Sequence, residues 1–203
     1  PIRVVTNLAS GRFGIAIARE AMLMGADVTL IYANIKVEPP KGVRLIKVNT
    51  SKEMFDAVMN ELKSKSYHAV IMNAAVSDFR PSITSNTKID SRSNDKITLV
   101  LEPTEKIVDH VKRVSPNTML VVFKADSVNQ GLVEKAIKKM RECDADLMIA
   151  NDALNSIDLD SCELFIIKKS GDVKHLGLID KTLAARIILR EVAEGLNKNR
   201  NDS

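Results

Sequence analysis

The chain has 203 residues, of which 45% are hydrophobic and 28% charged, and its 30 Lys and Arg against 26 Asp and Glu give a net charge of +4. Such a chain can bury a sizeable core, which excludes a disordered protein, and no apolar run approaches the roughly 18 residues of a membrane helix. Two cysteines cannot form a disulfide framework, so we expect a reducing, cytoplasmic location. Only 3% of the residues are aromatic and none is Trp, so no nucleic-acid or membrane partner is expected.

Short β-branched segments alternate with segments of helical period along most of the chain. The predicted strands are Ile2–Val5, Asp27–Ile31, Val43–Val48, His68–Met72, Ile97–Leu101, Met119–Phe123 and Leu147–Ala150. The predicted helices are Ile15–Met24, Ser51–Lys63, Glu105–Val114 and Val128–Arg141. This alternation is typical of an α/β domain with a Rossmann-like, three-layer fold, in which helices cover both faces of a mainly parallel sheet.

In the last quarter of the chain the pattern changes. Cys162–Ile167 and Val173–Leu176 flank the turn-forming residues Lys169–Asp172, which predicts a β-hairpin. Apolar residues at helical spacing predict a final helix from Asp180 onward. Because neither a repeat nor a linker is visible, we expect one domain over residues 1–203.

The first candidate site is the segment Thr6–Gly14, between the first predicted strand and a helix that opens with small residues. Gly11 and Gly14 allow backbone amides to approach a phosphate, and a helix N-terminus supplies partial positive charge. A plain strand–helix turn with Ser10 as its N-cap fits the same residues. The segment lacks the closing Gly-Lys-Ser/Thr of a P-loop, which excludes that motif.

The second candidate site is Asn73–Pro81, which follows a predicted central strand. Ligands of open α/β sheets bind at the carboxyl ends of the strands, and the two alanines here permit close backbone approach. Asp78 can hold a hydroxyl group or a metal ion. Alternatively, Asp78 pairs with Arg80 or caps a turn, and Phe79 lies in the core.

Three further segments carry weaker signals. Lys124 ends an apolar strand and is a candidate phosphate partner. Ala150–Asp152 places polar residues at another strand end, where they also suit a turn. The segment Ser77–Lys96 is a polar loop of the length that is usually functional or disordered, although its Lys88 taken alone fits a solvated side chain.

Other chemistries find little support in the sequence. His68, His110 and His175 have no metal-ligand spacing. Cys143 and Cys162 lack a CxxC partner and are expected to be inert thiols. No GxSxG elbow is present, which argues against a Ser-His-Asp hydrolase.

Taken together, the motifs resemble those of the phosphopantothenate–cysteine ligase family, which often forms the C-terminal half of a bifunctional coenzyme A biosynthesis protein. The matching segments are Thr6–Gly14, Ala74–Pro81, Lys88–Ile89, Phe123 and Ala150–Asp152. The resemblance implies an acid–amino-acid ligase that joins 4′-phosphopantothenate to L-cysteine. It further implies that the carboxylate is activated as an acyl-nucleotidylate made from CTP, with ATP as the less favoured nucleotide, and that Mg²⁺ is required.

The resemblance also assigns roles to single residues. The implied catalytic residues are Asn7, which holds the acyl-nucleotidylate for attack by the amine, and Lys88, which neutralises the triphosphate. The implied nucleotide-binding residues are Ser10, Gly11, Gly14, Ala74, Ala75, Asp78, Phe79, Lys88, Phe123 and Lys124. Asp78 is in addition the implied contact to the metal ion.

Three departures from the family pattern stand out. The family begins with a further strand and a Gly-Gly-Thr turn, so its first strand is expected to be missing before residue 1. Ala9 replaces a serine of the phosphate turn, and Glu102–Thr104 replaces Asn-Pro-Asp. The family also implies a homodimer and a phosphopantothenoylcysteine decarboxylase, fused or as a partner.

A short-chain dehydrogenase is the first alternative. Tyr32 and Lys36 have the spacing of its Tyr-x-x-x-Lys pair, but they follow the second predicted strand instead of lying late on a helix. Asn73–Val76 matches the Asn-Asn-Ala-Gly of these enzymes only in part.

A catalytically silent nucleotide-binding module is the second alternative. The departures at Ala9 and Glu102 favour it. The presence of both Asn7 and Lys88 argues against it, because a binding module needs no residue to stabilise an acyl-nucleotidylate.

Overall fold

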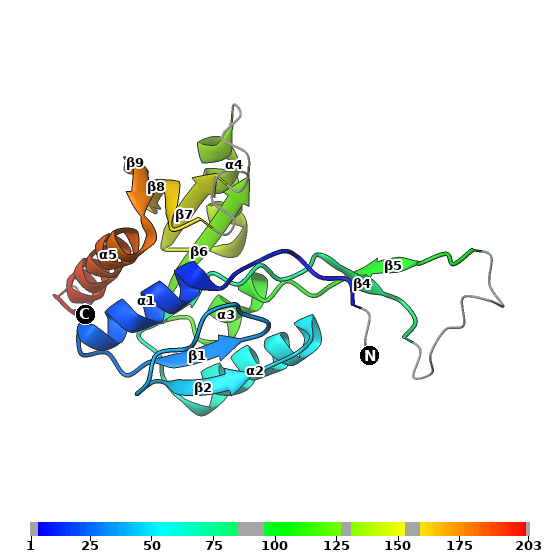
Figure 1. Cartoon of the computed structure of the whole chain (residues 1–203). Coiled ribbons are helices and arrows are strands. Elements are labelled where there is room, and N and C mark those ends of the chain that lie inside the picture. Colours follow the sequence, from blue (N-terminus) through cyan, green and yellow to red (C-terminus); the bar gives the residue numbers. More distant parts are fainter. Residues whose placement is uncertain (1–3, 85–95, 127–130, 153–158, 202–203) are drawn as a thin grey trace.

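The structure is a computed structural model that describes residues 4–84, 96–126, 131–152 and 159–201 (Figure 1). Its helices are α1 (Arg12–Leu23), α2 (Ser51–Ser64), α3 (Val108–Val114), α4 (Leu132–Cys143) and α5 (Lys181–Asn201). No helix in this described part has the length and hydrophobicity needed to span a membrane.

The main sheet has five strands in the order β3-β6-β7-β8-β9. They are β3 (Ala69–Met72), β6 (Met119–Asp126), β7 (Leu147–Asp152), β8 (Ser161–Lys168) and β9 (Val173–Asp180). The first three run parallel to one another, whereas β8 and β9 join as an antiparallel hairpin. The carboxyl ends of β3, β6 and β7 therefore meet at one edge of the sheet.

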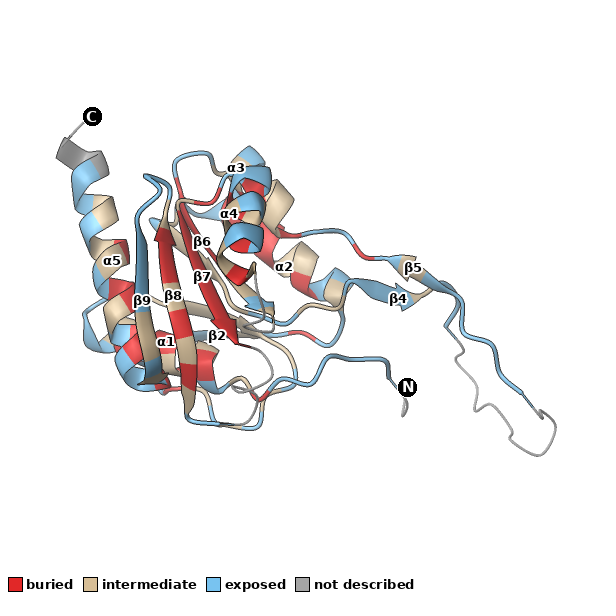
Figure 2. Cartoon of the chain, turned by 90° about the horizontal axis from the view of Figure 1, so that it is seen from above, coloured by how far each residue is buried: buried red, intermediate tan, exposed pale blue. Residues whose placement is uncertain are grey.

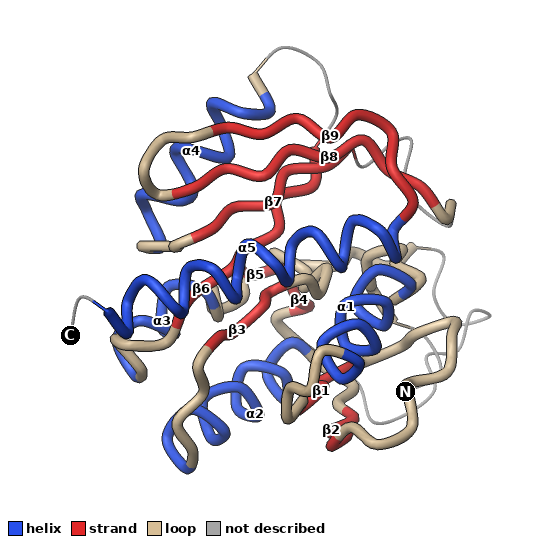
Figure 3. The backbone as a smooth tube through the Cα atoms, turned by 90° about the vertical axis from the view of Figure 1, so that its left-hand side faces the viewer, coloured by secondary structure: helices blue, strands red, loops and turns tan. Residues whose placement is uncertain are grey.

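A second, smaller sheet continues the layer beyond β3 (Figure 3). It consists of β1 (Thr29–Tyr32) and β2 (Arg44–Lys47), which run parallel. Among the described strands, β1 pairs only with β2 and β3 only with β6, so each has one edge without a neighbouring strand. The two sheets still share a core, because Ile31, Ile46 and Val70 all pack against the same apolar cluster.

Helices cover both faces of the main sheet (Figure 2). One apolar cluster joins α2, α3 and α4 to the sheet and includes Val111, Leu120 and Met148. The other joins α1 and α5 to the opposite face and includes Ile149 and Ile188. Burial on both faces explains why the strand sequences are continuously apolar, and it confirms the predicted three-layer α/β fold with its C-terminal hairpin and helix.

A two-stranded ribbon projects from this body (Figures 1 and 2). It pairs β4 (Phe79–Pro81) antiparallel with β5 (Leu101–Pro103). The sequence predicted a strand at Ile97–Leu101 instead, and it predicted no strand at β4. Phe79 is 51% exposed, so the alternative that places this ring in the core is wrong.

The prediction of a first strand at Ile2–Val5 is wrong for the residues that the structure describes. Val4 and Val5 are 65% and 50% exposed and belong to an irregular segment that leads to α1. A β-branched pair forms a strand only where a neighbouring strand supplies hydrogen bonds, and no described strand lies beside these residues.

Two sets of ion pairs fasten α5 to the rest of the molecule. Arg186 donates to Glu20 of α1, with Nε 2.9 Å from Oε2. Glu191 accepts from Lys168 of β8 at 2.5 Å and from Lys174 of β9 at 3.4 Å. The hydrogen bond from Lys168 is the main reason why the pKa of the Glu191 carboxyl lies below its ordinary value.

We expect Glu191→Gln to lower the free energy of unfolding at pH 7 by about 1 kcal/mol, because the lysines lose an ionised partner. A lowered carboxyl pKa stabilises the fold above the unfolded value of about 4.3, and this contribution is lost as pH falls through the folded value. The difference between wild type and variant should therefore shrink below about pH 4. Urea unfolding at several pH values measures it, with Glu38→Gln, an exposed carboxyl in the loop after β1, as control. A difference that stays constant with pH would contradict the assignment.

Candidate functional site

Polar residues gather where β3, β6 and β7 end, as the sequence predicted. Lys124 lies next to Ala150 in the parallel register, and Asp126 lies next to Asp152. Asn151 and Asp152 are only 9% and 4% exposed, and they belong to β7 itself, so their interpretation as turn residues is wrong. The edge thus combines buried polar groups with the loop that leaves β3.

The segment before α1 reaches this edge as a tight turn. Gly11 has a φ of +78° and is the N-cap of α1, so the alternative that makes Ser10 the N-cap is wrong. The Arg12 N–H lies 3.4 Å from Ser10 Oγ, and the Lys36 N–H donates to Ser10 O at 2.9 Å. The loop after β1 thereby covers the turn, so close that a Cβ on Gly11 would lie 2.4 Å from Ile35 Cγ2.

Asn7 joins this segment to the β3 loop, residues 73–78. Its Nδ2 donates to Ala75 O at 3.2 Å and to Val76 O at 3.3 Å. Carbonyl oxygens only accept hydrogen bonds, so the amide must present its nitrogen to the loop and its Oδ1 to the other side. Gly14 approaches the same loop, since a Cβ there would lie 3.1 Å from Asn73 Oδ1.

The β3 loop is also held from the side of β5. Thr104 donates through its N–H to Asp78 O at 2.9 Å and through Oγ1 to Ser77 O at 2.5 Å. Lys106 forms an ion pair with Asp78. Asp78 therefore does not pair with Arg80 as the sequence allowed.

Thr104 and Lys106 were missed as site residues. The only signal for Thr104 in the sequence is the replacement of the family's Asn-Pro-Asp by Glu102–Thr104. Lys106 carries no motif at all, because its contact to Asp78 spans 28 positions of the chain.

The remaining predicted residues differ in where they lie. The ring of Phe123 meets that of Phe13, in the first turn of α1, edge to face at a centroid distance of 5.2 Å, so Phe123 borders the turn. Lys124 is its neighbour in β6, with Nζ 3.7 Å from Asp126 Oδ2, and no described contact joins it to the turn. Lys88 lies outside the described residues.

Neither the two thiols nor the acidic side chains of the described residues offer an obvious reactive or metal-binding centre. Burial raises the pKa of the Cys143 thiol and raises that of Cys162 to about 11, in line with inert thiols. Among the described residues, no group of three or more His, Cys, Asp and Glu side chains could hold a metal ion. Asp78, whose side chain is 70% exposed, offers a single carboxylate.

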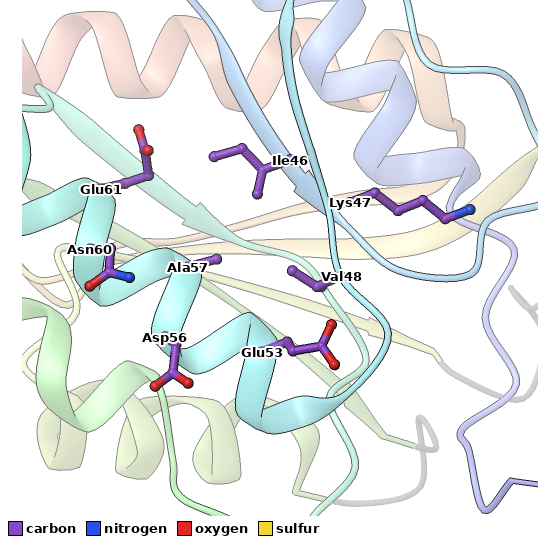
Figure 4. A pocket seen from close by; sticks show the side chains of 8 residues that line it. All are labelled: Ile46, Lys47, Val48, Glu53, Asp56, Ala57, Asn60 and Glu61. Atoms are coloured by element: carbon purple, nitrogen blue, oxygen red, sulfur yellow. The ribbon is translucent and has the colours of Figure 1, made fainter. Parts of the chain in front are cut away.

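A hollow of about 420 Å³ between β2 and α2 contains none of the predicted site residues (Figure 4). Its lining residues are Ile46, Lys47, Val48, Glu53, Asp56, Ala57, Asn60 and Glu61. Two of its acidic residues make structural contacts. Glu53 forms hydrogen bonds with Thr50, the N-cap of α2, and Asp56 forms an ion pair with Lys52. Hydrogen bonds from Arg44 and then Tyr67 lower the pKa of Glu61. This hollow is therefore a structural feature, and the candidate site is the edge at the β3 loop.

The chain is similar to known proteins over nearly its whole length. Residues 1–196 match the family described as the DNA/pantothenate metabolism flavoprotein C-terminal domain, and the chain belongs to this family. It is 38% identical over 189 residues to the coenzyme A biosynthesis bifunctional protein CoaBC of Thermococcus kodakarensis, covering 92% of this chain and 46% of that protein. A CoaBC of Borreliella burgdorferi is 29% identical, with 94% of this chain and 48% of that protein covered. The chain thus spans about half the length of the curated relatives it matches.

Solved structures of related proteins have a similar fold. The crystal structure of a CoaBC C-terminal domain superposes with a TM-score of 0.81 at 30% identity, covering 98% of this chain and 89% of that one. A Cab2 mutant in complex with phosphopantothenate-cysteine superposes with a TM-score of 0.79 over 100% of this chain and 83% of the other, and at 16% identity it supports the fold alone. The resemblance inferred from the motifs is confirmed.

Replacing Gly11 by Ala tests the packing of the turn. Gly25→Ala is the matched control, since Gly25 has a φ of +86° but open space around its missing Cβ. We expect Gly25→Ala to cost about 1 kcal/mol in free energy of unfolding from its backbone alone. Gly11→Ala should cost about 1–2 kcal/mol more, because Ile35 must move.

Thermal or urea unfolding of both variants measures this difference. In an Ile35→Gly background, which removes Ile35 Cγ2 as well as Ile35 Cβ at 2.8 Å, the extra cost of Gly11→Ala should disappear. Equal costs for the two glycine variants in the wild-type background would show that Ile35 does not press on the turn.

Proposed function

We propose that the chain is a phosphopantothenate–cysteine ligase of coenzyme A biosynthesis. It would join 4′-phosphopantothenate to L-cysteine through an acyl-nucleotidylate, made from CTP in preference to ATP. The observation that carries this proposal is the pair of hydrogen bonds from Asn7 to the carbonyls of Ala75 and Val76. These bonds bring the residue expected to act on the intermediate to the loop expected to hold the nucleotide.

The nucleotide would lie along the edge at the β3 loop. The turn at Ser10, Gly11 and Gly14 supplies backbone amides and the positive end of α1 to a phosphate. Ala74 and Ala75 would let a nucleobase approach their backbone N–H groups, because a methyl side chain covers little of the chain beside it. Their carbonyls already accept hydrogen bonds from Val76 N–H and Asn7 Nδ2. Phe79, at the start of β4, and Phe123, against the first turn of α1, would bound this space with their rings.

Asn7 would orient the amine in the second step. Its nitrogen is engaged by two carbonyls, so the atom left for a ligand is Oδ1, a hydrogen-bond acceptor. An acceptor suits the N–H groups of the cysteine amine as it approaches the acyl carbon. An oxyanion would need a donor instead, so Asn7 would act here by positioning.

Positive charge would balance the triphosphate. Lys88 is proposed to neutralise it, with Lys124 as a further cation on the edge. Mg²⁺ fits a site with one carboxylate, since it is commonly held by one or two carboxylates together with substrate phosphates, and Asp78 is the residue that would hold it. The metal would supply charge neutralisation to the phosphates.

The structure argues against the short-chain dehydrogenase alternative. Tyr32 is the last residue of β1 and Lys36 lies in the loop after it, so the pair is not presented by a helix. A silent nucleotide-binding module remains as the outcome of a negative test.

Pyrophosphate release with 4′-phosphopantothenate, Mg²⁺ and either CTP or ATP tests the proposal. We expect release with CTP, and amide product only when cysteine is added. Asn7→Ala should still release pyrophosphate but form the amide about 100-fold more slowly, because the amine is no longer oriented.

Asn7→Asp should fail in the same way, since a carboxylate cannot donate to the carbonyls of Ala75 and Val76. Asn60→Ala, on α2, is the control and should leave both steps unchanged. No release with either nucleotide would point to a silent module, and an unchanged amide yield in Asn7→Ala would overturn the role of Asn7.

We further propose that the chain acts in the cytoplasm as a homodimer that pairs through the ribbon, and that it works with a phosphopantothenoylcysteine decarboxylase, fused or separate. The relatives that it matches are described as bifunctional. The ribbon and its extensions expose apolar side chains that a second copy would bury: Phe79, Ile83, Ile97, Leu99, Val100 and Leu101. Exposed apolar groups gathered on one projection are typical of an interaction surface.

Light scattering should give twice the chain mass of 22.4 kDa. Ile83→Asp combined with Leu99→Asp should shift the mass to that of one chain, because each introduces a charge into the buried contact. Leu23→Asp is the control, since Leu23 is 67% exposed at the end of α1, away from the ribbon. A wild-type chain at monomer mass would contradict the dimer.

A further inference from the structure

We propose that Arg12 binds a phosphate group of a substrate and that Asp160 occupies the Arg12 guanidinium while no phosphate is bound. This inference rests on the proposed ligase function, because it adds a ligand contact to the same site. Two substrates of that reaction carry phosphate, the nucleotide and 4′-phosphopantothenate. The shared chemistry is a phosphate oxyanion, and the experiment separates the two sources.

Arg12 stands directly at the turn. It is the first residue of α1, immediately after Gly11, and its side chain is 41% exposed. A guanidinium donates two parallel N–H groups to a phosphate, and it stays charged at every working pH. Arg12 therefore follows directly after the turn whose backbone amides are proposed to receive phosphate.

Asp160 currently takes the place of such an anion. Its Oδ1 lies 2.9 Å from Arg12 Nη1, although the two residues are 148 positions apart in the chain. The Asp160 side chain is 81% exposed, so the carboxylate is not part of the packed core. A carboxylate presents two oxygens to arginine much as a phosphate does.

The backbone around Asp160 is fastened independently of this ion pair. Lys181, itself 8% exposed, donates through Nζ to Leu159 O at 2.6 Å and through its N–H to Asp160 O at 2.8 Å. The backbone of Asp160 would therefore stay near Arg12 even if the ion pair opened, and the carboxylate could return. Asp160 is thus a fixed competitor for the anion.

The energetics permit an exchange. An exposed ion pair contributes little stability, so opening it costs the fold little. A phosphate carries more charge than a carboxylate and makes stronger charge-assisted hydrogen bonds to arginine. Phosphate would displace Asp160, and the competition would weaken the apparent affinity slightly.

Opposite effects of two variants test this exchange. Asp160→Asn should lower the KM for one phosphate-bearing substrate about 2- to 5-fold, because Arg12 is released. Arg12→Met should raise the same KM at least about tenfold. In the Arg12→Met background, Asp160→Asn should have no further effect.

Measuring KM separately for CTP and for 4′-phosphopantothenate identifies which substrate carries the phosphate. Two controls report changes that do not involve the exchange. Asp172→Asn, in the turn between β8 and β9, adds the same net charge, and Arg19→Met removes an exposed arginine of α1. Neither control should change either KM.

If the Arg12–Asp160 ion pair only holds α1 to the start of β8, Asp160→Asn and Arg12→Met should change the KM in the same direction. An unchanged or raised KM in Asp160→Asn would therefore overturn the exchange. Calorimetric binding of CTP, 4′-phosphopantothenate and inorganic triphosphate separates this result from failure of the proposed function. If the wild type forms no product but the two variants shift the Kd in opposite directions, the ligase is wrong and the exchange holds. Equal Kd values would overturn the exchange alone.

Discussion

The parallel alignment of β3, β6 and β7 is the constraint on which the candidate site depends. It places three carboxyl ends at one edge, while helices bury both faces of these strands. Met148 and Ile149 are fully buried, and Asn151 follows only two residues later in the same strand. The strand thus changes from apolar to polar residues within two positions. The apolar part is the part that the helices cover, so the packing of the core determines where the polar part begins. A ligand that needs backbone groups and polar side chains finds both at this edge.

The β3 loop has little packing of its own, since it contains small and polar residues, and it is ordered from two sides. Asn7 donates to it from one side, and Thr104 donates from the other. Thr104 stands where the resemblance to the family leads us to expect the aspartate of Asn-Pro-Asp. A threonine hydroxyl donates to Ser77 O, whereas an ionised aspartate only accepts and would repel that carbonyl. The replacement is therefore compatible with an ordered loop, and it gives no support to a degenerate site.

Local pattern in the sequence was sufficient for most of the fold. Helical spacing predicted Ser51–Lys63, which differs from α2 by one residue, and the turn residues after β8 predicted the hairpin. The predicted first strand failed at Val4 and Val5 because strand propensity needs a neighbouring strand. The strand β4 was missed because it contains Pro81 and forms only by pairing with β5. Both depend on contacts between distant parts of the chain.

The same distinction applies to the site. Asn7 and Ala75 lie in motifs and could be predicted, although the bond between them spans 68 positions. Lys106 and Asp160 lie in no motif, so only the fold shows that they face Asp78 and Arg12.

The contacts at the edge fall into two kinds that differ in burial. Thr104 is 9% exposed, and its hydrogen bonds to the loop are neutral and costly to leave unmade. Asp78 and Asp160 have side chains that are 70% and 81% exposed, and their ion pairs add little to stability. The buried bonds therefore fix the backbone, whereas the exposed pairs can change partners at small cost. A site built in this way can accept a highly charged ligand without loosening the frame that positions it, because the groups that change partners are not those that hold the loop.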